Sequence, residues 1–246
     1  MANKATESAE PDFAEALTND RFIKVYVGEG PPFLVQQLLL ESLSYYFARA
    51  LQRDRFSEGI HGELRIEGDD RRTWQVLLHW LFKGMLPCQV KDDPDLLIDL
   101  WIVGDKYDVD ALQNDAMYAL LEYLDTTLDD ITLPLATMKD GIDRTTPGTV
   151  LRKVLAEEIL RATCCDRSAS SVDFIPWDAG GLASDLLQAS DACDQHGWSY
   201  LLNRFDQTSM RWQDSMLPGG RLGRDSSVVQ PRKKRTKLSH KRLRGT

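Results

Sequence analysis

The residue types that most often catalyse reactions or bind metals are few and scattered in this chain. The 246 residues include four histidines, His61, His79, His196 and His240. The four cysteines are Cys88, Cys164, Cys165 and Cys193, and none of them forms a C-x-x-C pair. Zinc sites need ligands spaced so that they converge, and disulfide frameworks are typical of small secreted domains. The sequence therefore predicts no metal ion, no cofactor and a reducing intracellular compartment.

Motifs of nucleotide and acyl chemistry are also missing. The glycine-rich stretch from Gly28 to Pro32 is followed by neither a Lys-Ser/Thr pair nor a long helix, so it predicts a turn instead of a phosphate-binding loop. There is no nucleophile elbow. His79 falls in a predicted helix without a second histidine at ligand spacing, which favours an ordinary core or surface position. We predict that the chain is not an enzyme.

The strongest chemical signal is a basic tail. Residues 231–246 contain eight Lys or Arg and no acid, and removing these eight from the 30 basic residues leaves 22 against 38 acidic ones. The body therefore has a net charge near -16 and the tail one near +8. The densest cluster resembles a monopartite nuclear-import signal and comprises Arg232, Lys233, Lys234, Arg235 and Lys237.

This cluster predicts nuclear localisation and a nuclear-import receptor as one partner. The alternatives are a solubilising tail, non-specific contact with nucleic acid or another polyanion, and docking of the tail on the acidic body. No lipidation motif accompanies the charge, no apolar run approaches the length of a membrane span, and the N-terminal residues lack the apolar core of a secretory signal. Membrane attachment and secretion are not expected.

A helical hairpin is the central element among those that must position a functional site. Asp93 before Pro94 is a helix start, and apolar residues at helical spacing follow to Tyr107. Asp108 is a second cap candidate, and a second apolar face extends to Leu124. Six residues are predicted to share one core, namely Trp74, Leu77, Leu81, Leu100, Trp101 and Leu112.

Upstream of this hairpin, strands and short helices alternate. Residues 22–27 and 33–35 predict two strands of a hairpin, and Leu64–Ile66 a third. A short helical segment is expected at residues 38–40, a second helix from Ser44 to about Arg53 and a third from Asp70 to a stop at Gly84, with residues 56–59 forming a loop.

This order and several local motifs resemble the BTB/POZ domain over residues 20–124. The matching motifs, in order, are Val25-Tyr26-Val27-Gly28, Phe33 to Leu40 at the family's F-x-V-H-K-x-x-L segment, Ser44 to Phe47 at S-x-x-F, Phe56-Ser57-Glu58 at F-x-E, Leu64-Arg65-Ile66, Trp80 to Gly84 at W-L-Y-x-G, and Leu97 to Tyr107 with Leu112-Gln113-Asn114. Gln36-Gln37 replaces the family's His-Lys pair, whose histidine contributes to a charged pocket near the dimer axis. Glutamine can form hydrogen bonds but cannot carry this charge.

The resemblance implies an α+β chain with a BTB/POZ fold, a small three-stranded sheet capped by about five helices. It divides the chain into a disordered N-terminus (1–19), a BTB/POZ domain (20–125), a helical C-terminal extension (126–215) and a disordered basic tail (216–246). In the extension, residues 150–163, 182–192 and 200–212 are predicted helices, and residues 131–134 break regular structure.

The function that the resemblance implies is a non-catalytic protein–protein interaction adaptor. It would self-associate as a homodimer and recruit a partner such as a cullin scaffold of a ubiquitin ligase or a transcriptional regulator. The predicted dimer interface consists of Leu38, Leu39, Tyr45 and Tyr46, which are more apolar and aromatic than one exposed helical face needs. The alternative for these residues is packing inside the monomer. A second hypothesis is a nuclear regulator that contacts nucleic acid through the tail.

Overall fold

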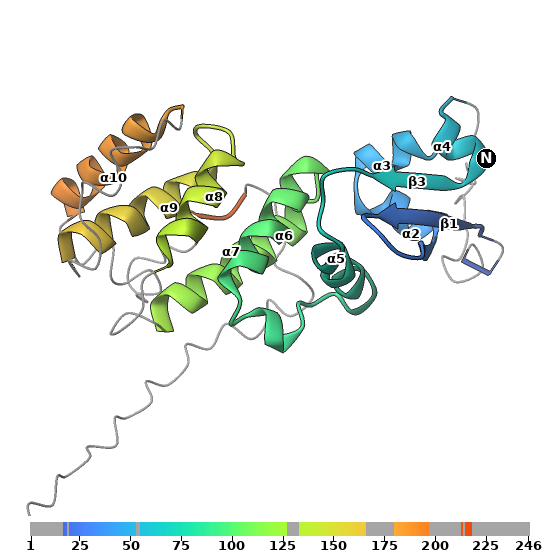
Figure 1. Cartoon of the computed structure of the whole chain (residues 1–246), viewed down its shortest axis with the longest axis horizontal. Helices are drawn as coiled ribbons and strands as arrows, with labels where there is room; N and C mark the ends of the chain where they lie inside the picture. The colour runs from blue at the N-terminus through green and yellow to red at the C-terminus, as the bar shows by residue number, and fades with distance from the viewer. Residues whose placement is uncertain are drawn as a thin grey trace, which may run out of the picture.

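The computed structural model describes residues 17–18, 20–52, 55–126, 133–165, 180–196, 213 and 215–217. The chain is α+β, with a small sheet towards one end and helices along the rest (Figure 1). The first elements are β1 (Phe22–Val27), β2 (Phe33–Gln36), α2 (Gln37–Leu43), α3 (Tyr45–Ala50), α4 (Ser57–His61), β3 (Glu63–Ile66) and α5 (Arg71–Lys83). They are followed by a 3₁₀ turn (Cys88–Val90), α6 (Pro94–Lys106), α7 (Asp110–Thr126), α8 (Leu135–Asp143), α9 (Val150–Leu160), a π-helical turn (Arg161–Cys165) and α10 (Leu182–His196).

The sheet has three strands in the order β2-β1-β3. β1 pairs antiparallel with β2, placing Val25 opposite Phe33, and parallel with β3, placing Val25 beside Leu64. Alternate residues of β1 are buried, because successive side chains of a strand point to opposite faces and only one face is covered by helices. The predicted small three-stranded sheet is confirmed.

Three predicted helix starts and one predicted helix end are confirmed, whereas the helix predicted to run from Ser44 to about Arg53 ends at Ala50. The side chains of Ser44, Asp70 and Asp93 accept hydrogen bonds from backbone N–H groups in the first turns of α3, α5 and α6. Pro94 is the first residue of α6, where a missing N–H costs no hydrogen bond. Gly84 ends α5 in the left-handed region, with φ of 69°.

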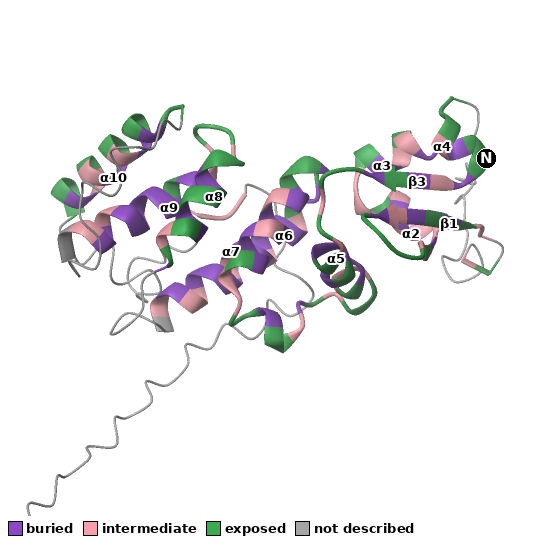
Figure 2. Ribbon diagram, viewed as in Figure 1, coloured by how far each residue is buried: buried purple, intermediate pink, exposed green. Residues whose placement is uncertain are grey.

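One core extends from the sheet through α6 and α7 to α9, as the buried residues in Figure 2 show. Five of the six predicted core residues are buried, namely Trp74, Leu77, Leu100, Trp101 and Leu112. The prediction for Leu81 is only partly right, because this side chain is half-buried. It lies in the last turn of α5, beside the exposed Phe82 and Lys83, where the core no longer covers the helix.

Two local predictions were wrong. Residues 57–61 form the short helix α4, whereas a loop was predicted. Asp108 does not begin α7; it has φ of 58° and ends α6. The N–H of Val109 donates to the carbonyl of Gly104 at 2.8 Å, and that of Asp108 to the carbonyl of Asp105 at 3.4 Å, which is the hydrogen-bond pattern of a Schellman end.

The helices after residue 133 pack on α6 through α8, a helix that the sequence patterns did not predict. α8 begins directly after Pro134, and Gly141 lets it approach both α6 and α9, since a Cβ there would lie 3.4 Å from Ile98 and 2.7 Å from Leu155. The predicted helices at 150–163 and 182–192 are confirmed as α9 with its π-helical turn and as α10. The helix predicted at 200–212 lies outside the described residues.

Candidate protein-docking site

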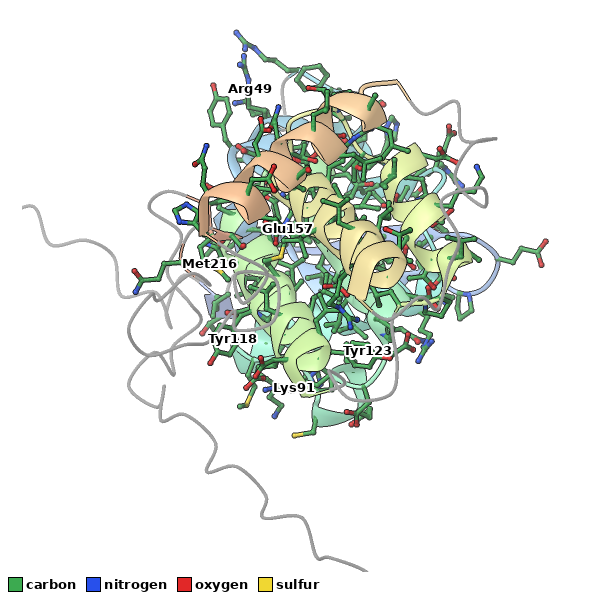
Figure 3. The ribbon with its side chains drawn as sticks, turned by 90° about the vertical axis from the view of Figure 1, so that its left-hand side faces the viewer. Arg49, Lys91, Tyr118, Tyr123, Glu157 and Met216 are labelled. Carbon is green, nitrogen blue, oxygen red and sulfur yellow. The ribbon has the colours of Figure 1, made fainter. Side chains whose placement is uncertain are left out.

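The site is a surface hollow between α3, α4 and the α6–α7 turn. α3 contributes Tyr45, Tyr46, Arg49 and Ala50, the start of α4 contributes Phe56 and Glu58, and the turn contributes Asp108, around a cavity of about 480 Å³. We call this group of residues the aromatic hollow. Arg49 lies at the periphery of the molecule (Figure 3), with its guanidinium 5.2 Å from the centre of the Tyr45 ring.

Three aromatic side chains of the hollow face solvent. Tyr45 is 67% exposed, Tyr46 44% and Phe56 46%. Aromatic side chains bury large areas when they are covered, and they are enriched at the centres of protein interfaces. Because they gather in one concave place instead of being scattered, the hollow is suited to receive an apolar side chain of another protein segment.

The wall of the hollow is fixed by the aromatic core beneath it. The Tyr46 ring lies 5.1 Å from that of Tyr107, which is 5.2 Å from Phe47 and 5.6 Å from Trp74. Asp69, whose side chain is 7% exposed, accepts hydrogen bonds from the Tyr107 hydroxyl at 2.6 Å and from Trp74 Nε1 at 2.9 Å. A rigid wall lowers the entropy that a partner loses on docking.

Tyr107 makes the folded state sensitive to alkaline pH. Burial and the hydrogen bond to Asp69 hold the pKa of Tyr107 above its ordinary value. The folded state therefore keeps the proton at a pH where the unfolded chain loses it, and this contribution to stability falls as pH rises beyond about 10. We expect Tyr107→Phe to cost about 1.5–3 kcal/mol at pH 7, since it removes a hydrogen bond to a charged group.

Urea unfolding at pH 7, 9 and 10.5 tests this, and the variant should lose less stability than the native chain over the alkaline range. Stability curves that stay parallel through pH 10.5 would contradict the assigned role of Tyr107.

The Gln36-Gln37 pair makes internal contacts. Gln37 is buried, accepts a hydrogen bond from Arg21 Nε at 2.5 Å, and donates to the Leu51 carbonyl at 3.2 Å and to Glu41. Gln36 Nε2 donates to the Leu17 carbonyl at 2.9 Å. The amides thus join the segment before β1 to α2 and the end of α3, where the resembled family has a charged pair.

The structure separates the four predicted interface residues. Tyr45 and Tyr46 both line the hollow, whereas Leu38 and Leu39 lie on α2 and do not. Both leucines are half-buried, and Leu39 packs against the core. Sequence reasoning missed the contribution of Phe56 because its F-S-E motif was interpreted as a loop. The available signal was the aromatic Phe56 directly before Ser57 and Glu58, residue types that are common at a helix start.

The remaining predicted features lie elsewhere. The import cluster at residues 232–237 lies outside the described residues. His61 and His79 are exposed, and the described part of the chain has no group of three His, Cys, Asp or Glu side chains that could hold a metal ion. None of the helices in the described ranges combines the length and apolar character needed to cross a membrane.

No model of a known protein family matches the chain, and no curated protein matches its sequence. The resemblance to the BTB/POZ domain therefore stays a prediction.

Proposed function

We propose that this protein is a non-catalytic interaction adaptor of the BTB/POZ type, which docks a partner protein in the aromatic hollow. The observation that supports this most is the exposure of Tyr45, Tyr46 and Phe56 around one cavity of about 480 Å³. The partner classes that the family resemblance suggests are a cullin-type ubiquitin-ligase scaffold and a transcriptional regulator.

The hollow has the composition of an interface centre. Its surface is mainly aromatic, while Arg49, Glu58 and Asp108 supply charges at its margin. Apolar centres supply most of the binding energy at interfaces, and charged margins tune partner choice and association rate. The aromatic contacts of Tyr46 with Tyr107 and Phe47 tie this surface to the core, so a partner meets a preformed wall.

Co-purification with mass spectrometry tests the docking role. In the full-length chain, Tyr45→Ser together with Phe56→Ser should remove the partners that the native chain retains. Leu187→Ser is the matched control, because Leu187 is 65% exposed on α10, far along the chain from the hollow. If both variants retain the same proteins as the native chain, the hollow is not the docking site.

Self-association through α2 and α3 is the second part of the proposal. Leu38 and Leu39 lie on α2, which directly precedes α3 in the chain and packs against it. Sedimentation of the full-length chain at micromolar concentration should show a dimer, which Leu38→Asp would weaken. A monomer at every concentration would refute self-association. It would not bear on partner docking in the hollow.

The second candidate is a nuclear regulator that contacts nucleic acid through its tail. It is favoured by eight cations in residues 231–246. Neutralising phosphates makes binding fall steeply with salt, so DNA affinity should drop on raising the salt and on deleting residues 231–246.

Changing Lys233 and Lys234 to Ala in a fluorescent fusion tests nuclear import. An unchanged distribution between nucleus and cytoplasm would argue against the import signal.

A further inference from the structure

The margin of the aromatic hollow carries more acids than bases. Glu58 and Asp108 line it, and Asp105 and Asp110 are exposed at the same α6–α7 turn, whose exposed Lys106 is paired with Asp69. Arg49 is the lining residue of opposite charge, and it lies over the Tyr45 ring. A ligand that suits this surface is an extended segment in which apolar side chains alternate with cations, since its apolar groups cover the rings and its cations meet the acidic margin.

Residues 231–246 of the same chain supply both kinds of side chain. In residues 231–246, Leu238 follows Lys237, and Leu243 stands between Arg242 and Arg244. The segment has a charge near +8, whereas the rest of the chain is near -16. A cationic segment tethered to an acidic body is attracted to it at low and moderate salt.

The described part of the chain ends on α7, the helix that follows the Asp108 turn. The N–H of Leu217 donates to Oδ1 of the buried Asn114 at 2.7 Å, and Met216 packs against the core (Figure 3). Asn114 stands four residues into α7 from Asp110, a distance of ~6 Å along the helix axis. Leu217, the last described residue, is therefore held on the helix that follows Asp108. The 21 residues from Leu217 to Leu238 could span up to ~70 Å, so the tether does not limit access.

We propose that residues 231–246 of the same chain occupy the aromatic hollow when no partner is bound. Covalent attachment within one chain gives a local concentration on the order of millimolar, so even a weak contact is populated. Leu238 or Leu243 would cover the rings, and the flanking cations would face Glu58 and Asp108. This inference rests on the hollow being a docking surface, as proposed above, and makes the tail a competitor that a partner must displace.

Photo-crosslinking in the full-length chain tests the contact. A benzophenone amino acid replaces Tyr45 in one protein and Leu187 in another, because the two side chains are almost equally exposed at 67% and 65%. The proteins are irradiated at submicromolar concentration, and the adducts are mapped by mass spectrometry. The probe at position 45 should attach within residues 231–246 of its own chain at least about fivefold more often than the probe at position 187, because only the hollow concentrates the tail.

Two further variants separate the charge from the apolar contribution. Glu58→Lys with Asp108→Lys, or salt of about 0.5 M, should lower the adduct yield severalfold by removing or screening the attraction. Leu238→Ser with Leu243→Ser should lower it too, and this variant alters none of the residues that form the hollow. The proposal is overturned if the probe at position 45 joins two chains, attaches elsewhere, or reaches the tail no more often than the probe at position 187. Those results would leave the co-purification test of partner docking unaffected.

Discussion

Replacing Arg152 with alanine is expected to lower the free energy of unfolding by ~3–5 kcal/mol, because it leaves a buried carboxylate without its partner. Arg152 Nε donates to Asp185 Oδ2 at 2.5 Å, and the two side chains are only 3% and 7% exposed. Its Nη1 donates to the carbonyls of Ile142 and Thr145, and its Nη2 to that of Gly180. One guanidinium thus joins the end of α8, the turn after it and the start of α10 to α9.

A surface arginine on the same helical extension is the control. Arg144 forms ion pairs with Asp99 and Asp140 at 2.7 and 2.6 Å, but its side chain is 41% exposed. Solvent screens such pairs, so Arg144→Ala should cost no more than about 1 kcal/mol. Urea unfolding followed by circular dichroism compares the two variants, and the Arg152 variant should show early loss of the extension's helices. Equal losses from both variants would mean that the buried pair does not hold the extension together.

Among glycine-to-alanine changes in the region from β1 to α7, the replacement of Gly59 is expected to be the most disruptive. A Cβ at Gly59 would lie 2.0 Å from the carbonyl oxygen of Gln52, which is backbone and cannot turn away as a side chain could. α4 would have to move away from the end of α3. The carbonyl of Gly59 also accepts a hydrogen bond from Arg21 Nη2, which that movement would break. We expect a loss of ~3 kcal/mol or more, because overpacking combines with the loss of a partly buried hydrogen bond.

Gly180→Ala is the matched control, because a Cβ at this position would meet no atom within 4 Å and the backbone there is not left-handed. This change should leave the thermal midpoint unchanged or slightly higher. Since α3 and α4 form two sides of the aromatic hollow, Gly59→Ala should also weaken partner capture in proportion to the displacement of Phe56. Thermal melts of both variants together with co-purification check this, and a Gly59 variant as stable as the Gly180 variant would refute the packing argument.

The local signals of the sequence determined most element boundaries. Caps act within three or four residues, so Ser44, Asp70 and Asp93 predict the starts of their helices independently of the rest of the chain. Alternation in residues 22–27 and helical spacing in α6 likewise identified a strand and a buried helix. The composition also separated an acidic body from a basic tail, since charge is additive along a sequence.

Contacts between distant residues could be decided only by the tertiary structure. The first turn of α2 has no side-chain cap of its own; the Asp20 carboxylate accepts from the Leu38 N–H at 2.6 Å across 18 positions. Asp108 suits a helix start by type, yet it adopts the left-handed conformation that ends α6, because the chain turns back there to pack α7 against α6. Phe56 joins Tyr45 and Tyr46 in the hollow because α4 folds back on α3 at Gly59. Propensity and spacing act along the chain, whereas a concave surface depends on which segments meet in space.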